Sequence, residues 1–228
     1  MHKLASLLFA IGLAALLIGL AAQLPLGMTP MVVGQAILEQ APGETGSANI
    51  VTSVVLAYRG IDTLGELAIL FAAATVAGLV LAPSIHAESR LRAKPRHDAG
   101  LVLRAGSDLL FPLLLSVGFY IVLHGHLTPG GGFQGGVVLA AAFFVSFLAR
   151  PARQPSHVGI VLIEALAGAS FIGIGLAALL GGGAFLQPVL DKGTLGQLVS
   201  AGSLPLLYLA VGLKVGAELS GLLAHLAE

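Results

Sequence analysis

Residues 157–180 read HVGIVLIEALAGASFIGIGLAALL, an apolar run in which Glu164 is the single carboxylate and lysine and arginine are absent. A run of about 18 or more such residues can cross a hydrocarbon core of roughly 30 Å as one helix. The whole chain has this character, since 57% of its residues are hydrophobic and 10% are charged, whereas soluble domains carry roughly 25% charged residues. The composition predicts an integral membrane protein and excludes a cytoplasmic enzyme, a nucleic-acid-binding protein and a secreted scaffold.

Five further apolar runs accompany this one. The six predicted spans are residues 4–22, 64–82, 108–124, 134–149, 157–180 and 202–226. The first run is too long for the apolar part of a signal peptide, and five more spans follow it, so we expect it to stay in the membrane. The sequence therefore predicts an all-α, polytopic integral membrane protein with about six transmembrane helices.

Basic residues are distributed unevenly between the loops that these spans define. One side of the six-span alternation collects Lys3, Arg90, Arg92, Lys94, Arg96, Arg104, Arg150 and Arg153. Arg59 and Lys192 fall on the other side. Because cytoplasmic loops carry the excess of lysine and arginine, both the N and C termini are predicted to be cytoplasmic, with 23–63, 125–133 and 181–201 outside. The predicted location is the inner (cytoplasmic) membrane.

A polar, basic stretch separates two predicted spans from the other four. We interpret it as the boundary between a two-helix module at 1–82 and a four-helix module at 101–228, joined by a cytoplasmic linker at 83–100. Within the predicted outer segment, residues 48–58 (ANIVTSVVLAY) predict a short helix. It is expected either along the membrane surface or against a partner.

Net charge and cysteine content limit the chemistry of the chain. Eleven basic residues balance eleven acidic ones, so the chain has no basic field that would attract nucleic acid. It has no cysteine, which removes disulfides, zinc–thiolate sites, iron–sulfur clusters and cysteine nucleophiles. No metal site and no cofactor are predicted, and any redox chemistry must belong to a partner. Contacts are expected with lipid and with other helices, for which the GxxxG at 212–216 is a weakly specific signal.

Three charged residues, Glu164, Lys214 and Glu218, lie well inside predicted spans, with Glu66 and Asp108 nearer helix ends. Each costs about 2.5–3.5 kcal/mol at the helix centre unless it is paired or hydrated. Lys214 stands near the middle of the last span, and Glu218 lies one helical turn further on the same face. Such a pair can exchange a proton with a neighbour, or it can be a structural ion pair that locks the helix to a partner. Glu164 has no partner in its own helix, so either it is protonated or another helix supplies its partner.

The string RGIDTLGE opens the second predicted span. Asp62 or Thr63 is a suitable helix N-cap, and Glu66, three residues after Thr63, completes a T-x-x-E capping box. Local helix chemistry thus explains this string without a function. Asp108 is interpreted in the same way, as a favourable charge in the first turn of the third span.

The densest local signal is HGHLTPGGGFQGG at 124–136, between the third and fourth spans. Its letters match GxGxxG, but a dinucleotide site needs a preceding strand in a βαβ unit, so we reject a nucleotide site. The glycines permit a tight, irregular backbone path close to another group, and the alternative is a simple hairpin between antiparallel helices. His124 and His126 can change charge near neutral pH and are candidates for a proton relay, with a structural role as the alternative. The predicted structural loop comprises Pro129, Gly130, Gly131, Gly132, Gln134, Gly135 and Gly136.

These strings carry a family resemblance. Residues 101–226, with GHLTPGGGFQGG at 125–136 and PLLYLAVGLKVGAEL at 205–219, resemble the MnhB-type subunit of the Mrp (Mnh) multisubunit cation/proton antiporters and its counterpart in membrane-bound hydrogenases. Residues 1–82, with NIVTSVVLAYRGIDTLGELAILF at 49–71, are similar to the two-helix tail of the large A-type antiporter subunit, a segment that is a separate small subunit in hydrogenases. The chain resembles a fusion of two neighbouring small subunits.

The resemblance implies an accessory subunit in a complex related to the membrane arm of respiratory complex I. Its expected function is a part in the exchange of protons for sodium or another monovalent cation, with or without an attached redox module. The alternative is a structural subunit that seals and positions the large antiporter subunits. Expected partners are the other membrane subunits of the antiporter module and a hydrogenase-like or other redox arm. On its own the chain is expected to catalyse nothing.

The resemblance also implies a part in ion or proton transfer for Glu66, which occupies the acidic position of the DTLGE string. This role is compatible with the capping box. The candidate residues for ion or proton transfer are Glu66, Glu164, Lys214, Glu218, His124, His126, Asp62 and Asp108.

Overall fold

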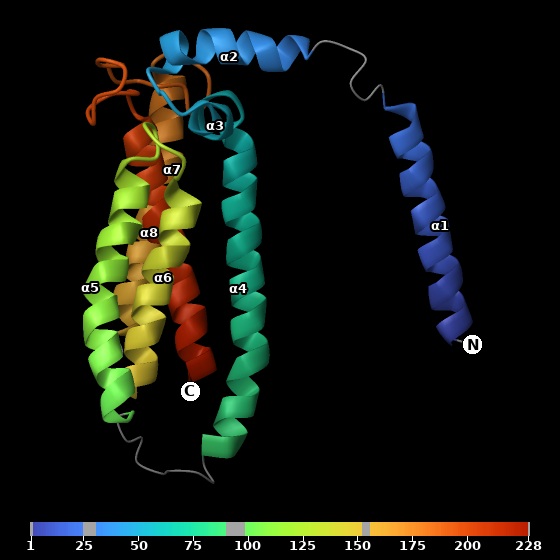
Figure 1. The fold of residues 1–228 in the computed structure, drawn as a ribbon, viewed down its shortest axis with the longest axis vertical. Helices are drawn as coiled ribbons and strands as arrows, with labels where there is room; N and C mark the ends of the chain where they lie inside the picture. Colours follow the sequence, from blue (N-terminus) through green and yellow to red (C-terminus); the bar gives the residue numbers. More distant parts are fainter. Residues whose placement is uncertain (1, 25–30, 90–98, 152–155, 228) are drawn as a thin grey trace. The chain divides into compact units, whose positions relative to one another are not determined.

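The computed structural model describes residues 2–24, 31–89, 99–151 and 156–227. Its regular elements in this part of the chain are helices (Figure 1): α1 (His2–Gln23), α2 (Val32–Thr45), α3 (Ile50–Thr52), the π-helical η1 (Ser53–Tyr58), α4 (Gly60–Ser89), α5 (Leu101–Leu123), α6 (Gly132–Ala149), α7 (His157–Leu180) and α8 (Leu204–Ala227). Among the described residues, six helices, α1 and α4 to α8, are long and apolar enough to cross a membrane. The prediction of an all-α polytopic membrane protein is therefore confirmed.

The chain divides into two compact units, residues 1–37 and residues 38–228. The first contains α1, which is apolar on all sides with a mean hydropathy of 2.5 over its span, and the beginning of α2. The second contains the remaining helices. The two predicted sequence modules stay a prediction, and residues 90–98 of the linker between them lie outside the described residues.

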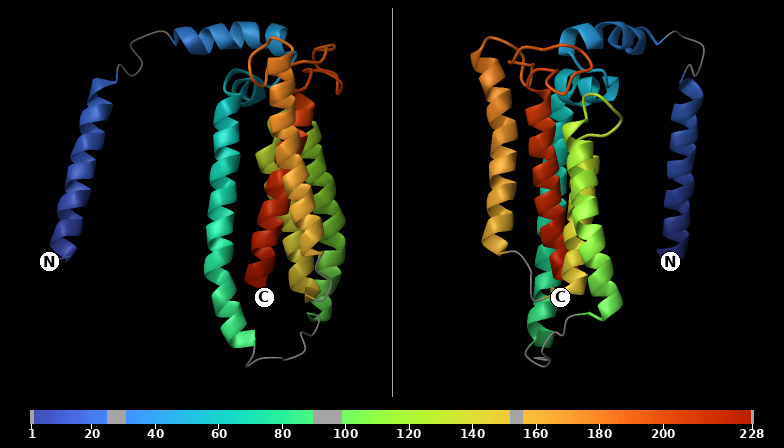
Figure 2. Two further views of the ribbon diagram at one scale, coloured as in Figure 1. Left: turned by 180° about the vertical axis from the view of Figure 1, so that it is seen from behind. Right: turned by 60° about the vertical axis from the view of Figure 1, so that its left-hand side comes forward.

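Helix α8 forms the centre of the second unit. It packs against α6, α7 and α4, and α6 packs in turn against α5 (Figure 2). Leu207, Tyr208, Val211 and Val215, which recur along α8 at helical spacing, are among the largest fully buried side chains. The most apolar stretch of α8 is 56% buried within the chain, against 6% for α4. Most of the α4 surface is therefore left for lipid or for another protein.

Glycines bring α6 close to both α5 and α8. A Cβ atom at Gly132 would lie 2.5 Å from the carbonyl oxygen of Tyr208, and one at Gly135 would lie 2.3 Å from Cγ2 of Val122. Neither position accepts a side chain unless a helix moves, so small residues set the spacing of these three helices. The GxxxG at 212–216 is confirmed as a helix contact, because both of its glycines face the backbone of α6.

Connections alternate between the two ends of the second unit (Figure 1). Residues 47–58, 124–131 and 181–203 lie at one end, which we call the loop end. The end of α6, the start of α7 and the C-terminus lie at the other, which we call the linker end. This is the alternation that the predicted topology requires of α4 to α8, with Lys192 at the loop end and Arg150 at the linker end. Which end faces the cytoplasm stays a prediction.

The predicted outer segment 23–63 contains more helix than its hydropathy indicated. Helix α2 was not predicted, because its sequence VVGQAILEQAPGET mixes polar and apolar residues. The short helix predicted at 48–58 is confirmed as α3 followed by η1. Asn49 caps α3 by accepting hydrogen bonds from the backbone amides of Val51 and Thr52. Because η1 packs against α4 and α8, one face of η1 is covered by helices of the same chain.

Candidate functional site

Three charged side chains meet inside the helix bundle. Lys214 of α8 places Nζ 3.1 Å from Oε1 of Glu164 on α7 and 3.2 Å from Oε2 of Glu218, one turn further along α8. The predicted pair of Lys214 and Glu218 is confirmed, and α8 supplies the partner that Glu164 lacks in its own helix. We call these three residues the charge cluster.

The position of Lys214 in α8 places the charge cluster at membrane depth. The span begins at Leu204, and at 1.5 Å per residue Lys214 lies about 15 Å along the helix. The ring of Phe71 on α4 covers the ammonium, with Nζ 5.0 Å from the ring centroid, which is within cation–π range. On α7, Gly168 lies beside the aliphatic part of Lys214, since a Cβ atom at this glycine would be 3.5 Å from Cδ of the lysine. Three helices therefore hold this lysine.

Glu218 is the least satisfied member of the charge cluster. Its side chain is 3% exposed, and neither of its oxygens accepts a hydrogen bond from the described residues, since Lys214 lies at ion-pair distance without hydrogen-bond geometry. Glu164, by contrast, accepts a hydrogen bond from Nζ of Lys214. Two carboxylates and one ammonium carry a formal charge of −1. A buried charge without compensation is unfavourable, so with both carboxylates ionised one further positive charge would make the cluster neutral.

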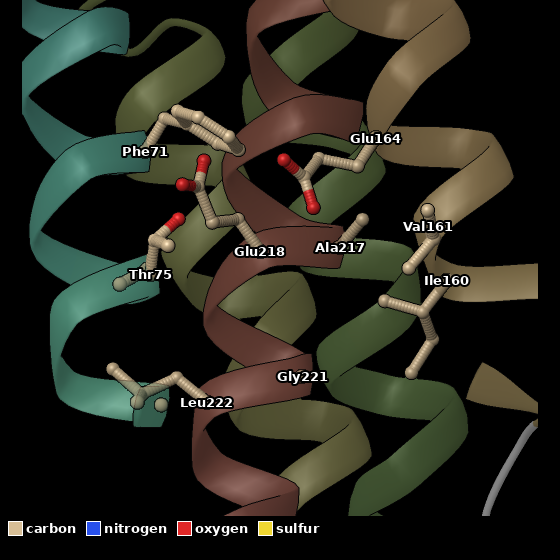
Figure 3. A pocket seen from close by; sticks show the side chains of 11 residues that line it. Phe71, Thr75, Ile160, Val161, Glu164, Ala217, Glu218, Gly221 and Leu222 are labelled. Atoms are coloured by element: carbon tan, nitrogen blue, oxygen red, sulfur yellow. The ribbon is translucent and has the colours of Figure 1, made fainter. Parts of the chain in front are cut away.

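Two pockets flank the charge cluster between α4 and α7. The smaller, of about 200 Å³, is lined by Phe71 and Thr75 of α4, Glu164 of α7 and Glu218 of α8. Figure 3 shows Thr75, Glu164 and Glu218 directed toward the space between their helices. The larger, of about 490 Å³, lies nearer the loop end and is lined by Phe71, Glu164 and Lys214. Phe71 and Glu164 border both pockets, so the two pockets are neighbours beside the cluster.

Glu66 belongs to a separate pocket at the loop end. This pocket, of about 280 Å³, is lined by Glu66, Tyr208 and part of the loop at residues 124–131, which we call the glycine loop. The predicted capping box is wrong, because α4 begins at Gly60 and already includes Thr63. Thr63 instead donates its hydroxyl to the carbonyl oxygen of Val55 at 2.6 Å. Glu66 is thus an exposed carboxylate beside the loop, and its part in ion transfer stays a prediction.

His126 is completely buried, and both of its ring nitrogens have partners. The Tyr208 hydroxyl contacts Nδ1, and the carbonyl oxygen of Gln197 lies 3.2 Å from Nε2. A neutral ring protonated on Nε2 satisfies both, with the Tyr208 hydroxyl donating to Nδ1. Burial lowers the pKa of His126, although the Gln197 carbonyl opposes this shift. His124 stacks on the ring of Tyr120, 4.2 Å between centroids, and the relay role of both histidines stays a prediction.

The glycine loop is bound by Asn49 and Thr52, a contact that was not predicted from the sequence. Asn49 donates from Nδ2 to the carbonyl oxygens of Gly125 at 2.8 Å and Thr128 at 2.9 Å. The Thr52 hydroxyl donates to the same Gly125 oxygen at 2.6 Å. These polar side chains interrupt the apolar string ANIVTSVVLAY, and that interruption was the signal available in the sequence.

The predicted structural loop is confirmed for Pro129, Gly130 and Gly131, but it is wrong for Gly132, Gln134, Gly135 and Gly136, which lie in the first turns of α6. Gly131 has a φ of 143°, a conformation that side-chain-bearing residues rarely adopt. The following residue, Gly132, begins α6. The loop also joins two helices that pack against each other, so the hairpin alternative describes the same structure.

Asp62 and Asp108 lie outside the charge cluster. Asp62, in the first turn of α4, forms an exposed ion pair with Arg59. The interpretation of Asp108 as a first-turn charge is wrong, because α5 begins at Leu101, about two turns earlier. Asp108 instead binds both terminal nitrogens of Arg150, at 2.6 and 2.7 Å. This bidentate pair joins α5 to the end of α6.

Known proteins are similar to this chain in sequence and in fold. A family model described as a domain related to the MnhB subunit of Na⁺/H⁺ antiporters matches residues 102–221, from α5 to α8. The chain belongs to the MnhB family. An uncharacterized protein of Methanocaldococcus jannaschii is 34% identical over 194 residues, which cover 75% of this chain and 74% of that protein. A probable A/B-type subunit of a K⁺/H⁺ antiporter from Rhizobium meliloti is 28% identical over 173 residues, which cover 67% of this chain and 17% of that protein.

Two solved structures match this MnhB-family chain over nearly its whole length. A chain in the membrane-bound sulfane sulfur reductase, an archaeal respiratory membrane complex, is 37% identical with a TM-score of 0.78, and the match covers 98% of this chain and 97% of the other. A chain in the Mrp complex of Dietzia sp. DQ12-45-1b is 29% identical with a TM-score of 0.72, covering 99% of this chain and 26% of the other. The resemblance to MnhB-type antiporter subunits is confirmed, whereas the origin of residues 1–82 by fusion stays a prediction.

Proposed function

We propose that this chain is an accessory membrane subunit of an Mrp-type module that exchanges protons for a monovalent cation, and that its charge cluster takes part in the transfer. Membership of the MnhB family supports the first part, as do the matching chains in an Mrp complex and in an archaeal respiratory membrane complex. The chain acts in the cytoplasmic membrane beside the other membrane subunits of the module. A redox arm drives the exchange where one is attached, and the chain itself catalyses no chemical reaction.

The observation that carries the second part is the charge cluster itself. Ionisable groups at membrane depth are rare in spanning helices and mark ion or proton pathways. Lys214 lies within 3.2 Å of two carboxylates on different helices. One pocket is lined by Glu164 and Glu218, and the other by Glu164 and Lys214. When a positive charge arrives at one carboxylate, the ammonium gains by pairing with the other. The cluster can therefore change its pairing as one charge enters or leaves.

A structural role alone is the second candidate, and two observations favour it. Close glycine contacts hold α6 against α5 and α8, and Asn49 fastens the segment before α4 to the glycine loop. Both features stabilise the helix bundle, and larger subunits can pack against its surface. In this case the charge cluster would only lock α7 to α8.

Separating transport from assembly distinguishes the two candidates. Glu164→Gln and Glu218→Gln would be made in the chain within its complete complex, with Asp191→Asn, an exposed loop-end carboxylate, as the matched control. Exchange is measured in inverted membrane vesicles by the collapse of a preformed pH gradient when NaCl or KCl is added, and assembly by co-purification and native electrophoresis. We expect each cluster variant to assemble normally and to lose exchange about tenfold or more, the effect of about 1.4 kcal/mol on a barrier, while the control retains it.

Full exchange by both cluster variants at unchanged assembly would leave the charge cluster with no transport role. Loss of exchange that always accompanies loss of assembly would favour the structural role. Both results differ from the expected one, in which only transport fails.

A further inference from the structure

The charge cluster carries a formal charge of −1 when both of its carboxylates are ionised. A pocket lies beside Glu218, whose oxygens accept no hydrogen bond from the described residues. From this geometry we propose that the pocket of about 200 Å³ between α4, α7 and α8 binds a monovalent alkali cation of the size of Na⁺, at Glu218, Glu164 and Thr75, in exchange for a proton. The inference rests on the proposed function, because it assigns a ligand to the cluster which that function uses.

Oxygen atoms from three helices converge on the pocket (Figure 3). Glu218 of α8 is the central ligand, since it is 3% exposed and neither oxygen accepts a hydrogen bond from the described part of the chain. Glu164 of α7 uses Oε1 for Lys214 and also lines the pocket, as does Thr75 of α4. Carboxylate and hydroxyl oxygens are the ligands of hard cations. The remaining lining is apolar or glycine, so these three side chains supply the side-chain oxygen atoms of the pocket.

The formal charge of the cluster sets the charge of the ligand. One added positive charge brings Glu164, Lys214 and Glu218 to neutrality, whereas a divalent ion would leave an excess of +1 in a medium of low dielectric constant. The pocket is larger than a bare alkali ion and has room for a few waters as well, at about 30 Å³ of liquid volume each. Protein oxygens on one side and water on the other can therefore complete the coordination shell.

A proton and a cation compete for the same carboxylate in this arrangement. The charged groups that face Glu218 are Glu164 from α7 and Lys214 from α8 itself. Helix α4 contributes Phe71 and Thr75 to the pocket, and α6, which also packs on α8, contains no titratable residue. When Glu218 takes up a proton, the cluster becomes neutral and the cation loses its main ligand. Release of the proton restores the site, so one carboxylate exchanges the two ions.

Carbodiimide labelling of the intact complex tests this competition at a single residue. Dicyclohexylcarbodiimide reacts with protonated carboxyl groups in membranes, and peptide mass spectrometry locates the adduct. We expect modification of Glu218 at mildly acidic pH in sodium-free buffer, and about tenfold suppression by NaCl but not by N-methylglucamine chloride at the same ionic strength. Modification that falls with rising pH but ignores NaCl would mean that only a proton occupies the pocket. Absence of modification under every condition would equally overturn the proposal.

Thr75→Val provides a second measurement that does not depend on the reagent. The substitution removes the hydroxyl and nearly preserves shape, and a hydrogen-bond-sized loss of about 0.5–1.5 kcal/mol corresponds to a two- to tenfold change. We therefore expect the half-saturating Na⁺ concentration of exchange to rise about two- to tenfold, with the maximal rate unchanged. Ser116→Ala, which removes an exposed hydroxyl from α5, is the control and should change neither. An unchanged half-saturating concentration in Thr75→Val would remove Thr75 from the site and contradict the proposal.

These outcomes separate the inference from the function on which it rests. If Glu218→Gln abolishes exchange but NaCl does not protect Glu218, the cation site is refuted and the role in proton transfer stands. If NaCl protects Glu218 but Glu218→Gln leaves exchange intact, the cation site stands and the transport role of the cluster is refuted.

Discussion

Replacing Lys214 by methionine should destabilise the assembled complex more than any other single substitution in the charge cluster. The ammonium lies 3.1 Å from Glu164 and 3.2 Å from Glu218, so its removal leaves two carboxylates with a formal charge of −2. Breaking a buried ion pair costs about 3–5 kcal/mol because a charge stays buried alone. The side chain of Glu164 is 19% exposed and both carboxylates border pockets, so we expect the lower end, about 3 kcal/mol.

Glu218→Gln should change the stability of the complex little, although Glu218 belongs to the same cluster. It leaves the Glu164–Lys214 pair intact with a formal charge of zero, and glutamine matches glutamate in shape. We expect a change within about 1 kcal/mol. The net charge left in the cluster, and not the number of contacts removed, thus determines which of the two variants is less stable.

The assay is the apparent melting temperature of the detergent-solubilised complex, followed by size-exclusion chromatography after heating. For a chain of this size, 1 kcal/mol shifts the midpoint by about 2–4 °C, so Lys214→Met should lower it by about 6–12 °C and Glu218→Gln by less than about 4 °C. Lys192→Met is the control, since this exposed lysine at the loop end donates to the Gly43 carbonyl oxygen. A Lys214→Met complex as stable as the control, or a Glu218→Gln complex equally unstable, would refute the charge-balance argument.

Three further predictions concern packing and the loop end. Gly135→Ala should destabilise the complex by about 1–3 kcal/mol through overpacking, because its Cβ would lie 2.3 Å from Val122, whereas Gly173→Ala on α7, with nothing within 4 Å, should be neutral or slightly stabilising; melting temperatures compare them. Burial lowers the pKa of His126, so stability associated with its neutral form is full above about pH 6.5 and declines as pH falls below that value, by up to about 1.4 kcal/mol per unit; His126→Asn should flatten a melting profile measured between pH 7 and 5. Asn49→Ala removes two donors from the glycine loop and should increase amide hydrogen exchange at 124–131, and unchanged exchange there would contradict this docking.

The membrane helices were predictable because lipid offers no hydrogen-bond partners to the backbone, so each crossing must be a long apolar helix. Their starts were less predictable. Helix α5 begins at Leu101, but the polar residues of its first turns depress hydropathy, and Asp108 was therefore placed in the wrong turn. Thr63 matched a capping box in letters, yet the preceding π-helix brings the Val55 carbonyl within 2.6 Å of its hydroxyl, and this contact replaces the cap.

The sequence predicted the contact between two of the three residues of the charge cluster, but not the contact with the third. Lys214 and Glu218 are four residues apart in one helix, so helical geometry alone brings them together. Glu164 meets Lys214 across 50 positions of sequence, and no local pattern specifies which helix faces it. Thr75 and Phe71 carried no signal at all, because a threonine or a phenylalanine in an apolar span resembles ordinary packing.

The amino-acid sequence by itself determined that this chain lies in a membrane and which of its runs are long and apolar enough to cross it. It also identified the few charged residues that are costly in lipid. Both follow from sequence because transfer into lipid depends on composition and on periodicity within a single helix. Only the tertiary structure decided that α4, α7 and α8 surround the cluster, that Glu218 accepts no hydrogen bond from the described residues and that Asn49 binds the glycine loop. Those facts depend on how helix faces pack, and small residues that allow close approach look alike in sequence wherever they occur.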